Sequence, residues 1–308
     1  MNMKNKVAIV LSIICLMNCR SEEFDLNYIP KDKNETGAIT KQMLATAEEF
    51  AYRTEHESQR LWIFRPSNLK ADELRPCVFF IHGGGWGGSP NTLAPQCLYL
   101  ARLGVVSVTI HFRKPSVKEG VSPYDCLADC LSAYRWVKQN GKQHNIDSDR
   151  IVVSGGSAGG HLSLAMVTID GHNNPADDLS VPVDPKAMIL FNPAMDLVNG
   201  WKGGAKKCES QGIDSATYSP AHHVKPGLPE TLILSGGKDN IISPAMIRQF
   251  MERMGKHGNK CSFVEYPEAG HSFFNYGRED NVYFHQTMTE VEKFLHKLGY
   301  LDASGNNK

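Results

Sequence analysis

Residues 151–163 read IVVSGGSAGGHLS, an apolar run, then a glycine-rich turn around Ser157, then the start of a helical pattern. A serine on such a sharp turn projects its hydroxyl above the carboxyl end of a sheet, and flanking glycines avoid clashes with neighbouring backbone. The following helix points free N–H groups toward developing negative charge. The stretch therefore predicts an α/β fold in which Ser157 is a nucleophile.

Phosphate-binding loops also place a glycine-rich turn between a strand and a helix. That interpretation requires a lysine in the turn, but Gly160 and His161 stand where Gly-Lys-Ser would be needed. We therefore favour a nucleophilic serine at this turn.

A second glycine-rich motif, HGGGW at 82–86, follows the apolar run 77–81 directly. Consecutive glycines leave backbone N–H groups unshielded, as an oxyanion hole requires. A flexible loop would explain the glycines, but it gives no reason for the flanking His82 and Trp86. Trp86 is predicted to contact substrate, either by stacking on a sugar or by walling off an acyl pocket, and the sequence leaves both open.

An acid and a base are expected to follow the serine along the chain, each in a loop after a strand. The motif GGKD ends at Asp239 after one apolar run, and the motif GHSFF places His271 after the last predicted strand. Both loops leave the same edge of the sheet as Ser157. Asp196 is the next candidate for the acid, and Glu268 ranks after it.

Apolar runs and helical patterns alternate along the chain, which predicts a mostly parallel sheet with helices on both faces. The stretch 196–225 is either a functional loop over the site or the region where this assignment is weakest. Strands are predicted at 60–64, 77–81, 105–110, 151–153, 188–191, 232–234 and 262–266, and helices at 40–50, 124–140, 161–168, 243–256 and 282–298.

The chain has 308 residues, enough for one large α/β domain, which we place at 46–300 with a tail at 301–308. Lysine plus arginine equals aspartate plus glutamate at 33 each, so no net charge attracts nucleic acid. The pair Lys206-Lys207 is interpreted as part of a solvated loop rather than a phosphate-binding patch.

The N-terminus is predicted to be a signal peptide over 1–18, because lysines precede an apolar run too short to span a bilayer. A buried strand or a short anchor is the alternative. The residues before Cys19 resemble a bacterial lipobox, so a lipid anchor on Cys19 and simple secretion both stay open. Residues 19–45 are then a linker or N-terminal arm, and the mature protein is periplasmic, anchored to the outer membrane or secreted.

The six cysteines after the leader dictate no disulfide framework. Cys77 and Cys261 lie in predicted strands and are expected to be buried thiols. Cys126 and Cys130 are four residues apart on one helix face, which favours a packed stripe over a disulfide. No CxxC or HExxH motif is present, so no zinc site is predicted. Chemistry based on Ser157 as a nucleophile needs neither a metal nor an organic cofactor, so none is expected.

The motifs HGGGW, GGSAGGHLS, GGKD and GHSFF together resemble α/β-hydrolase esterases of the hormone-sensitive-lipase-like and acetyl-esterase type, in the same order and over about 61–298. The resemblance implies the α/β-hydrolase fold, with an oxyanion hole made by the N–H groups of Gly84, Gly85 and Ala158. The run HFRKP at 111–115 departs from the family pattern, and no large lid of N-terminal helices is visible. The chain therefore also resembles exported carbohydrate esterases.

The resulting hypothesis is a serine carboxylic ester hydrolase that acts through Ser157, His271 and Asp239 and a covalent acyl-enzyme. Its expected substrates are short acyl esters of small molecules or polysaccharides, with membrane contact only through an N-terminal lipid. A serine peptidase or amidase on the same fold, and a catalytically silent binding module, are the alternatives.

Overall fold

The computed structural model describes residues 24–67 and 69–301. The predicted signal peptide at 1–18, the predicted lipidation site at Cys19 and the tail at 302–308 lie outside these residues. Within the described residues, no helix has both the length and the apolar character to cross a membrane.

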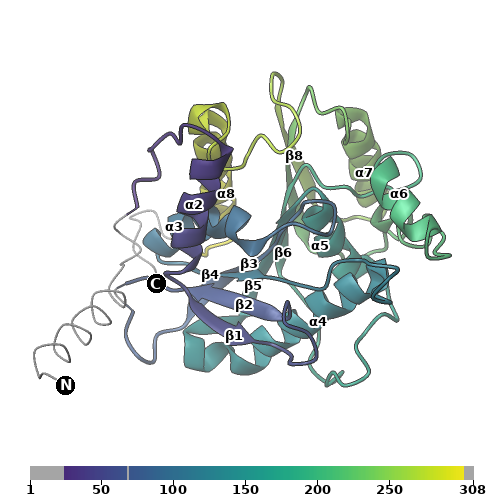
Figure 1. Cartoon of the computed structure of the whole chain (residues 1–308). Coiled ribbons are helices and arrows are strands. Elements are labelled where there is room, and N and C mark those ends of the chain that lie inside the picture. The colour runs from purple at the N-terminus through teal and green to yellow at the C-terminus, as the bar shows by residue number, and fades with distance from the viewer. Residues whose placement is uncertain (1–23, 68, 302–308) are drawn as a thin grey trace, which may run out of the picture.

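An eight-stranded sheet forms the centre of the molecule, with strand order β1-β2-β4-β3-β5-β6-β7-β8 (Figure 1). The strand β2 runs antiparallel to both its neighbours, and every other adjacent pair from β4 to β8 is parallel. The strands are β1 Glu48–Ala51, β2 Arg60–Phe64, β3 Arg75–Ile81, β4 Val106–Ile110, β5 Ile146–Gly156, β6 Ala187–Phe191, β7 Glu230–Gly236 and β8 Cys261–Tyr266.

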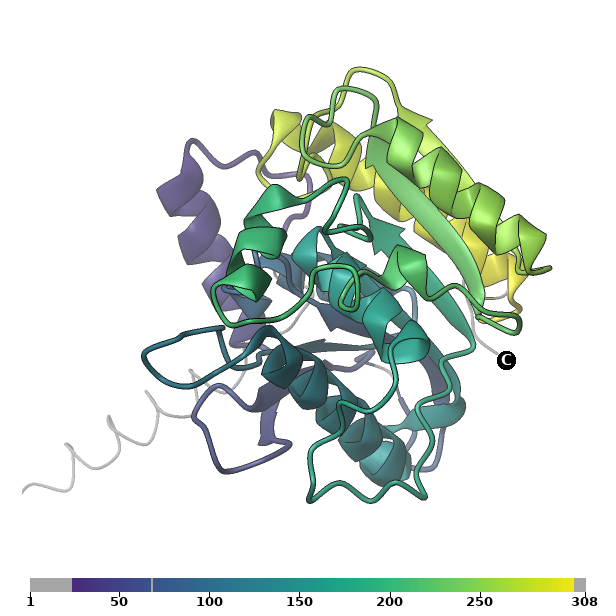
Figure 2. The same ribbon diagram turned by 90° about the vertical axis from the view of Figure 1, so that its right-hand side faces the viewer.

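Helices cover both faces of this sheet, as predicted. One face packs against α3 and α8, with α2 beside α3, and the other packs against α4, α5 and α7 (Figures 1 and 2). The α-helices are α2 Lys33–Leu44, α3 Ala94–Arg102, α4 Pro123–Asn140, α5 Ala158–Thr168, α6 Lys202–Glu209, α7 Pro244–Lys256 and α8 Val282–Lys297, and the short 3-10 helices are η2 Pro90–Leu93, η3 Gly141–His144, η4 Pro220–His222 and η5 Glu279–Asn281.

Alternation along the central strands explains why both faces are apolar. In β3, Val78 and Phe80 join the core under α3 and α8, whereas Cys77, Phe79 and Ile81 join the core under α4. Every residue of β3 is buried, which is the pattern expected of a parallel strand between two helical layers.

The N-terminal arm differs from the prediction. The helix predicted at 40–50 is wrong in its bounds, because α2 runs over Lys33–Leu44 and Glu48–Ala51 forms the strand β1. Of the two alternatives for 19–45, the described part from residue 24 onward is an arm held on the domain rather than a free linker. Met43 is fully buried, and Asn91 donates a side-chain hydrogen bond to the Thr40 hydroxyl over 2.8 Å. The polar composition concealed this contact, because only a narrow stripe of α2 faces the core.

The stretch 196–225 is also more ordered than a plain loop. It contains α6 and η4, and Leu197, Cys208 and Tyr218 are fully buried within it. Its glycines obscured the helical pattern in the sequence. The region lies beside the carboxyl end of β6, where it covers part of the candidate site.

The described cysteines are all free, and Cys77, Cys126 and Cys130 are buried as predicted. Cys261 is only partly buried, because β8 is an edge strand of the sheet. Burial raises the pKa of the Cys208 and Cys261 thiols to about 12. These thiols therefore stay protonated near neutral pH and act as small apolar groups.

A close backbone approach joins the turn around Ser157 to the end of β3. A Cβ on Gly159 would lie 2.0 Å from the carbonyl oxygen of Ile81 and 2.7 Å from that of His82. Only a glycine at the start of α5 lets the two segments pack this tightly.

We expect Gly159→Ala to lower the free energy of unfolding by about 3 kcal/mol or more, because backbone atoms must separate to admit the methyl group. Gly255→Ala is the matched control, since nothing lies within 4 Å of a Cβ at that helical position. That variant should gain about 0.5–1 kcal/mol. Urea unfolding of both variants tests the comparison, and an unchanged midpoint for Gly159→Ala would contradict it.

Candidate active site

Ser157 occupies the sharp turn between β5 and α5, as predicted. Its φ of 54° and ψ of −118° form a strained conformation for a residue with a side chain. Hydrogen bonds on both sides hold it there: the Ser157 amide donates to Phe191, and the Ser157 carbonyl accepts from His161 and Ala194. The hydroxyl is thereby fixed above the carboxyl end of the sheet.

The three side chains predicted to converge do so. Ser157 Oγ lies 2.9 Å from His271 Nε2, and His271 Nδ1 lies 2.7 Å from Asp239 Oδ2. A carboxylate only accepts, so Nδ1–H donates to Asp239 and leaves Nε2 free to accept the hydroxyl proton of Ser157. The residues come from the loops after β8, β7 and β5, which meet at one edge of the sheet.

The Asp239 carboxylate is fully buried, whereas the His271 side chain keeps 16% of its surface exposed. The second oxygen of the Asp239 carboxylate, Oδ1, accepts from the amides of Ile241 and Ile242 over 2.8 Å each. These bonds compensate for the lost hydration of the carboxylate and fix its orientation toward the imidazole.

Asn192 is a member of this region that the sequence did not reveal. It follows β6 with a positive φ of 35°, and its buried side-chain oxygen accepts from the Ser272 amide over 3.3 Å. The contact ties the His271 loop to the strand beside Ser157. An asparagine directly after a buried strand, able to adopt a positive φ, was the available signal.

The HGGGW loop lies against the serine turn. A Cβ on Gly83 would lie 2.6 Å from the Gly156 oxygen and 3.4 Å from Ser157 Cβ. Gly84 and Gly85 have φ values of 71° and 62°, and among the described residues their amides donate no hydrogen bond.

Ala158 directly follows Ser157 and adds another amide that has no acceptor among the described residues. It is the first residue of α5, so its N–H has no partner within the helix. Donors at the start of a helix also lie at the positive end of the helix dipole. Among the described residues, the predicted donors Gly84, Gly85 and Ala158 therefore have amides without a hydrogen-bond partner.

Lys207 on α6 holds the glycine loop from outside, since its ammonium donates to the Gly85 carbonyl. Burial lowers the pKa of Lys207, and the nearby charge of Lys114 lowers it further. The interpretation of Lys206-Lys207 as solvated loop is therefore wrong for Lys207. A lysine pair in a polar stretch carried no signal for this contact, which depends on how α6 folds back.

His82 and the run at 111–115, which departs from the family pattern, support the HGGGW loop from the interior of the protein. His82 Nε2 lies 3.0 Å from His111 Nδ1, and the His82 ring stacks on Phe112 at 4.3 Å between ring centroids. His82 is fully buried, and burial lowers its pKa to about 3, with a smaller effect from His111. The pair is therefore a neutral, hydrogen-bonded support.

The prediction that Trp86 contacts substrate is not supported. Its side chain has no exposed surface, and its ring contacts those of His161, Trp201 and Tyr218. A ring without exposed surface cannot stack on a sugar. Trp86 instead packs in the core beneath Trp201, which is partly exposed beside Gly85.

The alternative acids do not reach His271. Asp196 pairs with His222 over 3.2 Å and caps the turn at Val198 and Asn199. Glu268 forms a solvent-exposed ion pair with Lys238. Within the described residues, no group of three or more His, Cys, Asp or Glu side chains is arranged to hold a metal ion.

Comparison with known proteins adds sequence and structural relatives. The BD-FAE family model matches residues 61–254, and the Dienelactone hydrolase family model matches residues 219–297. Esterase 2 of Thermogutta terrifontis, phosphonylated by sarin, is 35% identical, with a TM-score of 0.79 over 84% of this chain and 97% of its own. The propionate-bound form of that esterase is 37% identical, with a TM-score of 0.76 over 83% of this chain and 95% of its own.

Among curated relatives, the probable carboxylic ester hydrolase LipM of Mycobacterium tuberculosis is 25% identical over 84% of this chain. An acetylxylan esterase of Xylanibacter ruminicola is 26% identical over 63% of this chain and 40% of its own length. The chain spans 62% of the length of LipM and 64% of that of the esterase LipU from Mycobacterium tuberculosis.

We expect Asp239→Asn to lower kcat on 4-nitrophenyl acetate by about 10³–10⁴-fold, because the amide no longer selects the required His271 tautomer. The fold should persist, since the asparagine oxygen still accepts from the amides of Ile241 and Ile242. Asp170→Asn, at an exposed carboxylate paired with Lys225, is the matched control. Equal rates for the two variants would contradict the role of Asp239.

We also expect stability to fall on acidification below about pH 6.5, where histidines of the unfolded chain become protonated. His82 and His161 are buried, and burial lowers their pKa to about 3 and about 4. Both side chains stay neutral in the folded protein. Their contribution to the free energy of unfolding is therefore fully present above pH ~6.5, and as the pH falls towards their lowered pKa values it decreases by about 1.4 kcal/mol per histidine per pH unit. Urea unfolding between pH 8 and 5 tests this, and constant stability would contradict it.

Proposed function

Since this chain belongs to the BD-FAE family of α/β-hydrolases, we propose that it is a serine carboxylic ester hydrolase. The observation that carries the proposal is the continuous hydrogen-bonded line from Ser157 through His271 to the buried Asp239. The glycine loop packs on the serine turn through Gly83, and among the described residues the amides of Gly84, Gly85 and Ala158 have no hydrogen-bond partner, which supports their proposed role as oxyanion donors. A nucleophile, a base and oxyanion donors in one place constitute the requirements for acyl transfer.

In the first half of the reaction, His271 Nε2 takes the proton of Ser157 as Oγ forms a bond to the ester carbonyl carbon. The carbonyl electron pair moves onto its oxygen, where the amides of Gly84, Gly85 and Ala158 stabilise the charge. The intermediate collapses, the bond to the alcohol oxygen breaks, and the alcohol leaves with the proton from His271. Asp239 stabilises the imidazolium while it exists.

In the second half, His271 removes a proton from water as the water oxygen attacks the acyl-serine. The same amides hold the second oxyanion. Its collapse breaks the bond to Ser157 Oγ, which recovers the proton from His271 and releases the carboxylic acid. Ser157 and His271 thus return to their starting protonation states, and the cycle needs no external redox partner.

Short acyl groups are the proposed substrates, with acetyl groups on polysaccharide as a specific form. Esterase 2 of Thermogutta terrifontis has been observed with propionate and with butyrate bound. The relative from Xylanibacter ruminicola is an acetylxylan esterase. Both support small acyl groups, and we further propose export of the chain on the basis of its N-terminal lysines and apolar run.

Ser157→Ala is expected to keep its fold and to lose hydrolysis of 4-nitrophenyl acetate. A fluorophosphonate probe should label the wild-type protein and leave this variant unlabelled, because the probe reacts with an activated serine. Ser163→Ala is the matched control, since Ser163 donates to a helix carbonyl and lies away from His271. Undiminished hydrolysis by Ser157→Ala would refute the proposal.

The enzyme should be assayed with three kinds of substrate: a series of nitrophenyl esters of increasing acyl length, acetylated xylan and a peptide anilide. Preference for the short esters is expected, together with acetate release from xylan. Faster cleavage of the anilide would instead indicate a peptidase or amidase.

A further inference from the structure

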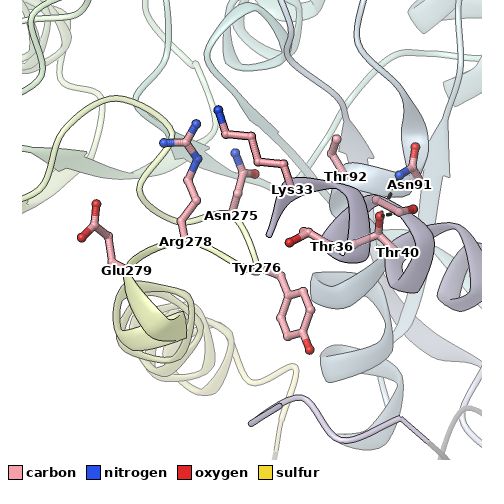
Figure 3. Close-up of a pocket in the computed structure, with 11 residues that line it drawn as sticks. Lys33, Thr36, Thr40, Asn91, Thr92, Asn275, Tyr276, Arg278 and Glu279 are labelled. Carbon is pink, nitrogen blue, oxygen red and sulfur yellow. Dashed lines mark hydrogen bonds between the residues drawn. The ribbon is translucent and has the colours of Figure 1, made fainter. Parts of the chain in front are cut away.

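A cavity of about 410 Å³ lies between the N-terminal helix α2 and the loop that follows the candidate catalytic histidine (Figure 3). Its size falls in the range of small-molecule binding sites. The side chains that carry the argument below are Lys33, Thr36, Thr40, Asn91, Asn275 and Arg278.

The walls of the cavity include segments that continue from the loops of the proposed reaction centre. Asn275 follows His271 by four residues, and the Asn275 amide donates to the Ser272 carbonyl over 3.3 Å. This bond closes a tight turn that keeps Asn275 near His271, the proposed base, along the chain. The opposite wall includes Asn91 in η2, which continues from the HGGGW loop. Both walls therefore extend directly from loops of the site.

Free donors converge on the mouth of this cavity. Figure 3 shows the ends of Lys33, Asn275 and Arg278 directed toward the same region. Among the described residues, the Lys33 ammonium, the Arg278 guanidinium and the Asn275 amide group form no hydrogen bond or ion pair. Long cations near each other without a carboxylate partner favour an anionic ligand, and a guanidinium matches a carboxylate in geometry.

Within the part of the chain that the structure describes, no acid forms an ion pair with Lys33 or Arg278, and this includes Glu279 and Asp280. Asp32 accepts from the amides of Asn34 and Glu35 as the cap of α2. The Glu35 carboxylate accepts from the Tyr28 hydroxyl and the Lys31 amide. Glu279 lines the cavity, but its side chain lies on the far side of Arg278 from Lys33 in Figure 3.

The cavity wall is mixed: apolar surface makes up the larger share, and hydroxyl and amide groups supply the polar part. The Thr36 and Thr40 hydroxyls and the Asn91 amide line it, and Asn91 is oriented by its bond to Thr40. Hydroxyl and amide groups match the hydroxyls of a sugar. A ligand that satisfies both the wall and the mouth combines several hydroxyls with one carboxylate.

We propose that this cavity is a subsite for a uronic acid unit, a sugar that carries a carboxylate, in the ester substrate. The assignment rests on the proposed ester hydrolase function and adds the class of alcohol that it acts on. Lys33 and Arg278 bind the carboxylate, and Asn275 binds a sugar hydroxyl. The Thr36 and Thr40 hydroxyls donate to the carbonyls of Asp32 and Gly37, so towards the sugar their oxygens act as acceptors. The N-terminal arm, through α2, thereby contributes to substrate specificity.

Hydrolysis of two acetylated methyl glycosides, a glucuronoside and a glucoside with the acetyl group at the same position, tests the proposal. The wild-type kcat/KM should be roughly five- to tenfold higher for the glucuronoside, a ratio expected for charge-assisted hydrogen bonds. Added salt should reduce this preference, because the cations are exposed. Equal values for the two glycosides would overturn the subsite.

Lys33→Gln and Arg278→Gln should each lower the glucuronoside preference, and the double variant should remove it. Lys142→Gln, an exposed lysine in η3 before β5, is the matched charge control and should keep the wild-type preference. Arg278→Lys should retain part of it. A double variant that keeps the full preference would overturn the assignment.

Binding separates this proposal from the proposed function. Titration of Ser157→Ala with unacetylated methyl glucuronoside should give saturable binding that the Lys33→Gln and Arg278→Gln double change weakens. Absence of binding refutes the subsite even when 4-nitrophenyl acetate is hydrolysed by the wild type. Binding without any ester hydrolysis by the wild type would refute the proposed function and leave a carbohydrate site.

Discussion

The contact between the serine turn and the end of β3 is the constraint on which the site depends. Without a side chain at Gly159, the start of α5 lies directly against the carbonyl oxygens of Ile81 and His82. That approach places the glycine loop beside Ser157, so nucleophile and amide donors share one rigid support. Electrostatic stabilisation of an oxyanion requires such fixed donors, because donors that had to reorient during the reaction would offset the stabilisation that they provide.

Around this contact, hydrogen bonds to buried side-chain oxygens also orient the reacting atoms. Asp239 receives amides from Ile241 and Ile242 on one oxygen and the imidazole on the other. Asn192 performs the same role for the His271 loop through the Ser272 amide. Each bond removes a rotational freedom from a group that must be aligned for proton transfer.

The outer parts of the fold complete this support and form the wall of the proposed subsite. Lys207 approaches the glycine loop from α6, and α2 supplies one wall of the cavity beside the His271 loop. Both elements lie in stretches of polar, glycine-containing sequence, where helices form because tertiary contacts stabilise them. A common catalytic edge can therefore carry different recognition surfaces without changes to its hydrogen-bonded core.

Local pattern alone predicted the central strands, the helices α4, α7 and α8, and the convergence of Ser157, Asp239 and His271. These features follow from apolar periodicity, turn glycines and the rule that loops after parallel strands meet at one edge. Tertiary structure decided that Trp86 is buried, that Lys207 reaches Gly85 and that the arm begins its helix at Lys33. Those outcomes depend on which distant segments cover a residue, and no spacing within the chain encodes that information.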